Sequence, residues 1–151
     1  MDMSRIVFPY GIRFREDGRV ETFPAIEVSI LGNNGNGLRT VFHIDSGATT
    51  SLLPAGDARA LGIVLDRNKK VLIRGITGKP LVGFRHIVAV DFGELEVKVP
   101  AVFMEADDVP RILGREIIFE RFAILFDEFK KRTLFLERRG ESRIIDKLFL
   151  T

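Results

Sequence analysis

Residues 40–53 read Thr-Val-Phe-His-Ile-Asp-Ser-Gly-Ala-Thr-Thr-Ser-Leu-Leu, an apolar strand pattern that stops at an acidic residue. That residue is Asp45, and the run Ser46-Gly-Ala-Thr49 follows it. A carboxylate at the end of a strand is held on rigid backbone, and a glycine soon after it permits a tight turn. The small residues after Asp45 also let the main chain of a substrate come close. The pattern therefore makes Asp45 the first candidate for chemistry.

The segment before Asp45 predicts a β-hairpin. Residues 25–31 alternate between apolar and polar, as a strand with one buried face does. Residues 38–44 form a second strand-like run, and the glycine- and asparagine-rich residues 32–37 tolerate the positive φ of a turn. A phosphate-binding loop is the alternative for this run. It requires a helix after the loop and a closing Lys-Ser/Thr pair, and neither is present.

The rest of the chain is dominated by short runs with strand character. Further strands are predicted at residues 70–74, 81–92, 94–103, 123–127 and 133–137, and short helices at residues 54–61 and 115–122. Turn residues separate these runs, and Gly62 supplies a C-terminal stop for the first helix. Many short strands with one or two short helices predict a mainly-β barrel or sandwich.

The composition is that of one ordinary globular domain. The 151 residues are 46% apolar and 29% charged with a net charge of +2, so we predict a single domain over residues 1–151. The near balance of charge argues against a nucleic-acid partner, which needs clustered basic residues. The sequence has no cysteine, which excludes disulfides and thiol catalysis. It shows no signal-peptide pattern and no apolar run of ~20 residues, so we expect no membrane partner and a cytoplasmic location.

Three segments together resemble the retropepsin-like, or retroviral-type, aspartic peptidase family. The first is the active-site region around Asp45-Ser-Gly47. The second is Ile112-Leu-Gly-Arg115, which is similar to the second signature of the family. The third, Gly75-Ile-Thr-Gly78, lies where the family carries the tip of its flap, a glycine-rich hairpin that closes over substrate. The resemblance spans residues 25–137 and implies a small closed β-barrel of the acid-protease type with aspartic endopeptidase activity.

The chemistry of aspartic proteolysis predicts a homodimer. Two carboxylates about 3 Å apart share one proton, since like charges so close cannot both ionise. One acts as general base on water, and the protonated one polarises the scissile carbonyl. The chain has no second Asp-Ser/Thr-Gly, because Asp17-Gly18 and Asp91-Phe-Gly93 lack the hydroxyl residue. A twofold axis that brings Asp45 against its own copy completes the pair. Water is the nucleophile, so no cofactor is expected, and the expected partners are a second copy and a peptide or protein substrate.

The resemblance assigns a role to each matching residue. Asp45 is the expected catalytic carboxylate, Ser46 is expected to hydrogen-bond across the dimer axis, and Gly47 is expected to offer its carbonyl to substrate. The expected substrate-binding residues are His43, Ala48, Thr49, Ile112 and the flap residues Gly75, Ile76, Thr77 and Gly78. Gly114 is expected to allow close packing behind the active-site loop, and Arg115 completes the second signature.

Two features depart from the family pattern. Retroviral members usually carry an acidic residue soon after the alanine, and it pairs with the arginine of the second signature. Thr49 and Thr50 occupy that stretch here, which leaves Asp57 as the candidate partner of Arg115. The flap segment also lacks adjacent glycines.

Other interpretations of the same residues compete with the peptidase. Asp45 alone could be a plain turn residue, since Asp before Ser-Gly is a good turn signal. A second interpretation keeps the fold as a catalytically silent peptide-binding or dimerisation module. A serine hydrolase centred on Ser46 needs a histidine base, and only His43 and His86 are available, without a Gly-x-Ser-x-Gly elbow. The same two histidines stand too far apart in sequence to indicate a metal site, and none is expected.

Overall fold

The structure is a computed structural model, and it describes residues 4–75, 78–93, 95–106 and 108–150. The fold is mainly β, as the short alternating runs predict. The elements in chain order are β1 (Arg5–Pro9), β2 (Gly11–Phe14), β3 (Val20–Phe23), β4 (Ala25–Leu31), β5 (Gly37–Ile44), β6 (Ser51–Pro54), α1 (Ala55–Ala60), the 3-10 helix η1 (Arg67–Lys69), β7 (Lys70–Arg74), β8 (Pro80–Asp91), β9 (Glu96–Met104), β10 (Ile112–Leu113), α2 (Ile118–Arg121), β11 (Phe122–Asp127), β12 (Arg132–Glu137) and α3 (Arg138–Lys147).

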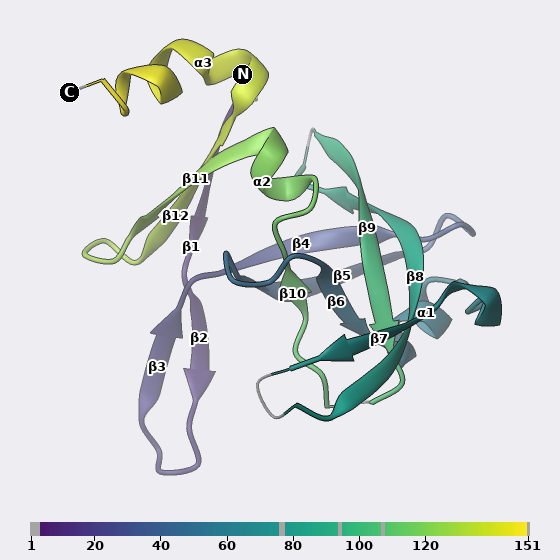
Figure 1. The fold of residues 1–151 in the computed structure, drawn as a ribbon. Coiled ribbons are helices and arrows are strands. Elements are labelled where there is room, and N and C mark those ends of the chain that lie inside the picture. The colour runs from purple at the N-terminus through teal and green to yellow at the C-terminus, as the bar shows by residue number, and fades with distance from the viewer. Residues whose placement is uncertain (1–3, 76–77, 94, 107, 151) are drawn as a thin grey trace.

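The central body is a closed β-barrel (Figure 1). Strands β4, β5, β10, β6, β9 and β8 are hydrogen-bonded in that order, and β4 also pairs with β8, which closes the ring. Strand β7 pairs with the first part of β8 and extends the sheet beyond the ring. The small closed β-barrel implied by the resemblance is therefore confirmed.

The hairpin predicted before Asp45 is confirmed. Strands β4 and β5 are antiparallel, with a register that runs from Ala25 opposite His43 to Leu31 opposite Gly37. The alternation of β4 arises because Val28 and Ile30 point into the core. Gly35 in the connecting loop has a φ of 76°, a conformation that glycine adopts without steric cost.

Large apolar side chains fill the barrel and continue into a neighbouring sheet. The fully buried ones include Ile26, Ile30, Phe42, Leu53, Phe103, Leu113, Phe122 and Phe135. Burial of each contributes about 2 kcal/mol. The rings of Phe92, Phe122 and Phe135 lie with centroids 5.2–5.8 Å apart, and they join the barrel to strands β11 and β12.

The neighbouring sheet brings the two ends of the described chain together. Its order is β1-β12-β11, with all pairs antiparallel. Helix α3 follows β12 and lies near the N-terminal end of β1 (Figure 1). The buried Glu141 of α3 accepts hydrogen bonds from Ser4 Oγ at 2.6 Å and from Arg5 Nη2 at 3.0 Å. This helix is an addition to the two short helices predicted.

Strands β2 and β3 form a separate antiparallel hairpin that projects from the rest of the molecule (Figure 1). Asp17 Oδ1 accepts a hydrogen bond from Arg19 N at 3.0 Å in its turn. One face of the hairpin carries Ile12, Phe14 and Val20, which are all exposed. No element is predicted from the sequence before residue 25, so β1, β2 and β3 are additions to the predicted fold.

Helix α2 is shorter than the helix predicted over residues 115–122. Ile117 has a φ of 67°, which lies in the left-handed region, so the helix begins only at Ile118. The backbone N–H groups of Arg115 and Glu116 are bonded instead to the loop that contains Asp45. In the described part of the chain, no helix is long and apolar enough to span a bilayer.

Candidate active site

Asp45 lies directly after β5 at the start of a tight turn. Its backbone N–H donates to Leu113 O at 3.1 Å, and its carbonyl accepts from Ala48 N at 3.3 Å. Its carboxylate Oδ1 accepts from Gly47 N at 2.8 Å. Aspartate forms this turn readily because its short side chain reaches the backbone two residues later. The carboxylate is thus oriented by its own loop and remains partly exposed.

The second signature begins with β10, which lies between β5 and β6, the two strands that flank the Asp45 loop. Strand β10 runs parallel to β5, with Ile112 opposite His43, and antiparallel to β6, with Ile112 opposite Leu52. Farther along, Arg115 N donates to Ala48 O and Glu116 N to Thr49 O, both at 2.9 Å. Residues 113–116, which are nearly seventy positions away in sequence, therefore fix the backbone of the Asp45 loop.

Gly114 marks the closest approach of these segments. A Cβ at this position would lie 2.7 Å from the carbonyl carbon and oxygen of Thr50 and 2.9 Å from Ala48 O. Backbone atoms of a hydrogen-bonded loop cannot move away as a flexible side chain can. Gly114 N also donates to the hydroxyl of the buried Ser51 at 3.1 Å. Only glycine fits here without displacing the Asp45 loop.

The predicted pairing of Asp57 with Arg115 is wrong. Asp57 is buried in the first turn of α1, and both of its oxygens accept from Arg111, at 2.6 Å from Nε and 2.8 Å from Nη2. These hydrogen bonds raise the pKa of Arg111, against a smaller lowering by burial. Arg115 instead reaches Thr49 Oγ1 at 3.2 Å. Arg111 stands immediately before Ile112 of the second signature. That position is the only sign in the sequence that Arg111, and not Arg115, pairs with Asp57.

His43 is contacted by the β2–β3 hairpin. Its Nε2 lies 3.2 Å from Arg13 Nη2, and its ring stacks on Phe23 with centroids 4.5 Å apart. Burial lowers the pKa of His43, and the neighbouring Arg13 cation lowers it further, while Asp45 acts in the opposite direction. His43 is among the substrate-binding residues expected from the sequence, whereas Arg13 and Phe23 of the hairpin are not.

The other predicted site residues lie on two parts of the fold. Ser46, Gly47 and Thr49 are exposed in the Asp45 loop, and Ala48 and Ile112 are half-buried. Gly75 and Gly78 lie between β7 and β8, and Gly78 N donates to Gly75 O at 3.0 Å. Gly78 has a φ of 73°. The predicted flap residues Ile76 and Thr77 lie outside the described residues.

In the described residues, neither histidine is placed as a serine hydrolase or a metal site would need it. His43 Nε2 faces Arg13, and His86 Nε2 accepts from Asp66 N at 3.3 Å, so neither approaches Ser46 as a base in the described contacts. Among residues 4–75, 78–93, 95–106 and 108–150, no three His, Asp or Glu side chains are placed to hold a metal ion.

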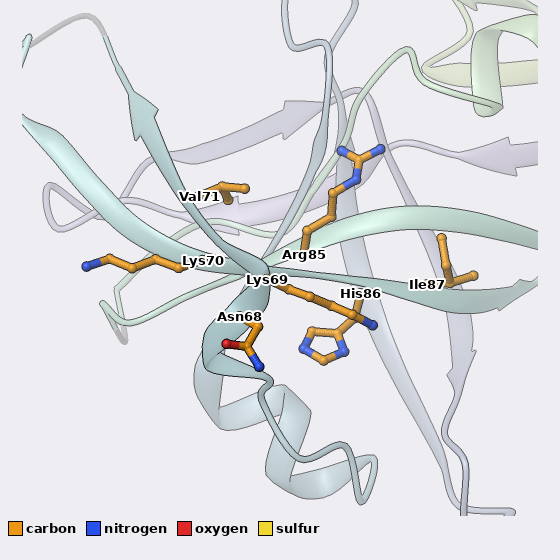
Figure 2. A pocket seen from close by; sticks show the side chains of 7 residues that line it. All are labelled: Asn68, Lys69, Lys70, Val71, Arg85, His86 and Ile87. Atoms are coloured by element: carbon orange, nitrogen blue, oxygen red, sulfur yellow. The ribbon is translucent and has the colours of Figure 1, made fainter.

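A cavity of about 410 Å³ lies beside the first residues of β7 and the middle of β8 (Figure 2). It is lined by Asn68, Lys69, Lys70, Val71, Arg85, His86 and Ile87. In Figure 2 the Asn68 and Lys69 side chains lie on the same side of the strands as His86, whereas Arg85 points away from them. Arg85 pairs with Glu116 at 2.5 Å. The cavity contains none of the residues predicted for the active site.

Comparisons with known proteins agree with this arrangement. A family model described as aspartyl protease matches residues 26–117, which include both signatures and strands β5 to β10. A retropepsin-like aspartic protease from Rickettsia conorii has the same fold, with a TM-score of 0.53, 21% identity, and coverage of 87% of this chain and 89% of that one. A comparison with curated protein sequences finds no match.

A second similar structure is EIAV protease complexed with the inhibitor HBY-793. Its TM-score is 0.52 at 24% identity, with coverage of 66% of this chain and 88% of that one. The shared barrel and the match over both signatures confirm the retropepsin-like resemblance. The chain belongs to the aspartyl protease family.

Proposed function

We propose that this protein is an aspartic endopeptidase that acts as a homodimer. Two copies of Asp45, one from each chain, activate a water molecule that hydrolyses a peptide bond. One carboxylate takes a proton from the water, and the other, protonated, donates a hydrogen bond to the scissile carbonyl. No cofactor enters this reaction.

The geometry of Asp45 carries the proposal. In the described part of the chain, its carboxylate has one hydrogen bond, from Gly47 N to Oδ1 at 2.8 Å. The other oxygen is therefore available to water or to a second carboxylate. The loop donates a hydrogen bond from Asp45 N to Leu113 O and accepts hydrogen bonds from Arg115 N and Glu116 N, so the carboxylate lies on fixed backbone. A rigid, partly exposed carboxylate meets the geometric need of general base catalysis.

The dimer follows from the number of available carboxylates. The sequence has one Asp-Ser/Thr-Gly, and the chemistry needs two such groups about 3 Å apart. Ser46 is exposed beside Asp45, so a twofold axis can bring both residues against their copies. We expect Ser46 to hydrogen-bond across this axis.

An extended peptide is the substrate that the surrounding residues suit. Gly47 is exposed and without a side chain, which leaves room for substrate main chain beside the carboxylate. His43 and Ile112 lie opposite one another on β5 and β10 and are half-buried, as expected for the wall of a pocket.

The test is cleavage of an unfolded protein between about pH 3 and 7 by wild type, Asp45→Asn and Asp91→Asn. Asp91 is a matched control, because it ends β8 and its Oδ1 accepts from Gly93 N at the same 2.8 Å. We expect Asp45→Asn to lower the rate by on the order of 10³ or more, because the amide cannot share the proton. We expect Asp91→Asn to cut like wild type.

Each outcome decides between interpretations. Equal cleavage by wild type and Asp45→Asn would contradict the proposal and assign the activity to another site. A wild type that binds unfolded peptides but cuts none would favour the catalytically silent peptide-binding module.

A further inference from the structure

The β2–β3 hairpin lies outside residues 26–117, the segment that matches the aspartyl protease family. Its two faces differ. One face exposes Ile12, Phe14 and Val20. The other face carries Arg13 and Phe23, which contact His43 on β5. An element outside the matched segment therefore reaches the strand that leads to Asp45.

Arg13, Phe23 and His43 form one cluster. The Arg13 guanidinium lies 4.7 Å from the centroid of the Phe23 ring, and the same ring stacks on His43. A guanidinium has only hydrogen-bond donors, so in the 3.2 Å contact between Arg13 Nη2 and His43 Nε2 the imidazole nitrogen is the acceptor. The cluster holds the guanidinium in one place, because ring stacking and a hydrogen bond both restrain it.

Arg13 has no ion-pair partner among the described residues, although Glu16, Asp17 and Glu21 line the same surface hollow. Arg19 in the same hairpin pairs with Asp17 at 3.2 Å, whereas Arg13 forms no ion pair with any described carboxylate. Glu21 stands opposite Arg13 in the strand register but does not pair with it in the described contacts. The side chain is exposed, so its remaining N–H groups are available to a ligand.

Arg13 and Asp45 both lie near the His43 ring. His43 precedes Asp45 by two residues, and side chains two residues apart on an extended chain share a face. Both Arg13 and Asp45 act electrostatically on the His43 ring. A peptide that crosses Asp45 would therefore pass close to a fixed and unpaired cation.

We propose that Arg13 is a specificity-determining residue that binds an acidic side chain of the substrate close to the cleaved bond. The proposal rests on the proposed peptidase function. Arginine suits this task because its planar guanidinium can donate two parallel hydrogen bonds to a carboxylate. Because His43 and Phe23 restrain the guanidinium in advance, little conformational entropy is lost when the acidic side chain binds.

The experiment measures the charge preference of the cleft. A peptide sequence is taken from a site that wild type cuts in an unfolded protein, and its scissile amide is replaced by a reduced bond. Fluorescent versions carry Glu, Gln or Lys at each position flanking that bond in turn. Their Kd values are measured by fluorescence anisotropy near pH 7, where imidazole is mostly neutral. Wild type is compared with Arg13→Gln, Arg13→Glu and Arg15→Glu, the last an exposed arginine of the same hairpin.

We expect wild type to bind the Glu peptide about tenfold more tightly than the Lys peptide at one flanking position. Arg13→Gln should remove this preference, Arg13→Glu should reverse it, and Arg15→Glu should keep it. A Glu-to-Lys ratio in Arg13→Glu within about twofold of wild type at every position would overturn the proposal. So would an equal change in Arg15→Glu, which would indicate a general effect of charge.

Two further results separate this inference from the proposed function. A wild type that cuts no protein at all would refute the peptidase, whereas one that cuts without a charge preference refutes only the assignment of Arg13. If Arg13→Glu dissociates the dimer in sedimentation while the Glu-to-Lys ratio is unchanged, Arg13 contacts the second copy and not the substrate.

Discussion

Two aspartates in this protein end a strand in the same local geometry. Asp45 follows β5 and Asp91 ends β8, and a glycine two residues later donates its N–H to Oδ1 of each at 2.8 Å. Both carboxylates are partly exposed. The Asp-x-Gly turn thus orients a carboxylate wherever it occurs, and it does not by itself make a site.

The surroundings of the two turns differ. The Asp91 turn leads back into β9, with Phe92 N bonded to Leu95 O at 2.9 Å and the Phe92 ring buried among other aromatic rings. The Asp45 turn is followed by the exposed Ser46 and is bonded to a segment nearly seventy residues away. Long-range hydrogen bonds and an exposed residue after the aspartate therefore distinguish the candidate site from an ordinary turn.

The largest expected effect comes from the point where that support is closest. Gly114→Ala would place a Cβ 2.7 Å from Thr50 backbone, so we expect a loss of about 3 kcal/mol or more in the free energy of unfolding. Urea denaturation measures it. The control is Gly56→Ala in α1, where an added Cβ meets nothing within 4 Å, and we expect it to be neutral or slightly stabilising. Equal stability of the two variants would contradict the tight packing.

The next effect tests the ion pair beside the second signature. Arg111→Leu leaves the Asp57 carboxylate buried without its two hydrogen bonds, and we expect a loss of about 2–3 kcal/mol. The value lies below that of a fully buried pair because the Arg111 side chain is 34% exposed. Arg115→Leu removes an exposed hydrogen bond and should change the unfolding midpoint little. A larger loss of stability in Arg115→Leu than in Arg111→Leu would indicate that Arg115 is the partner of Asp57. That result would contradict the pairing seen in the structure.

Alanine substitutions at the glycines of the two turns should affect different properties, stability at Gly93 and activity at Gly47. Gly93 has a φ of 107°, so Gly93→Ala should cost about 1–2 kcal/mol in stability and leave the activity of the folded protein unchanged. A Cβ at Gly47 would press on Asp45 Oδ1 at 3.1 Å. Gly47→Ala should therefore lower kcat/KM by about tenfold to a hundredfold with little loss of stability. Thermal unfolding and cleavage rates are measured together, and matching effects in both variants would remove the distinction.

The smallest effect concerns the proton on His43. Burial, and then Arg13, lower its pKa below the usual 6.5, so the unfolded chain binds this proton at higher pH than the folded chain. The stability from neutral His43 is complete above about pH 6.5 and is lost as the pH falls through the folded-state pKa. Arg13→Gln should raise the pKa of His43 in an NMR titration. His86, whose pKa is lowered by burial and by Lys69, should not move and serves as the internal control.

Much of the barrel could be predicted because its strands alternate against a buried face. The alternation of residues 25–31 predicts strand β4 with its observed bounds, because its apolar side chains point into the core. The β2–β3 hairpin escaped prediction because Ile12, Phe14 and Val20 are exposed, so its alternation marks no buried face. Helix α3 contains Gly140 and a kink at the buried Glu141, which weaken the local helical pattern.

The candidate site could be predicted only where its residues are neighbours in sequence. The Asp-Ser-Gly run and the glycine of the second signature are local patterns. The pairing of Arg111 with Asp57 joins residues 54 positions apart, and the contact of Arg13 with His43 joins residues 30 apart. Such contacts depend on pairings between segments that are distant in sequence, such as β10 with β5 and β6, and no local pattern encodes them.

The most direct test of the central claim is a mixture of active and inactive chains. Wild type at a fixed amount is unfolded and refolded together with increasing amounts of Asp45→Asn, and the rate of peptide cleavage is measured. If each site needs two Asp45 carboxylates, mixed dimers are inactive, and the rate falls to about half at an equal amount of variant and toward zero in excess. A control mixture with Asp91→Asn should lose no activity. A rate that stays constant as Asp45→Asn is added would show that one chain suffices and would contradict the shared active site.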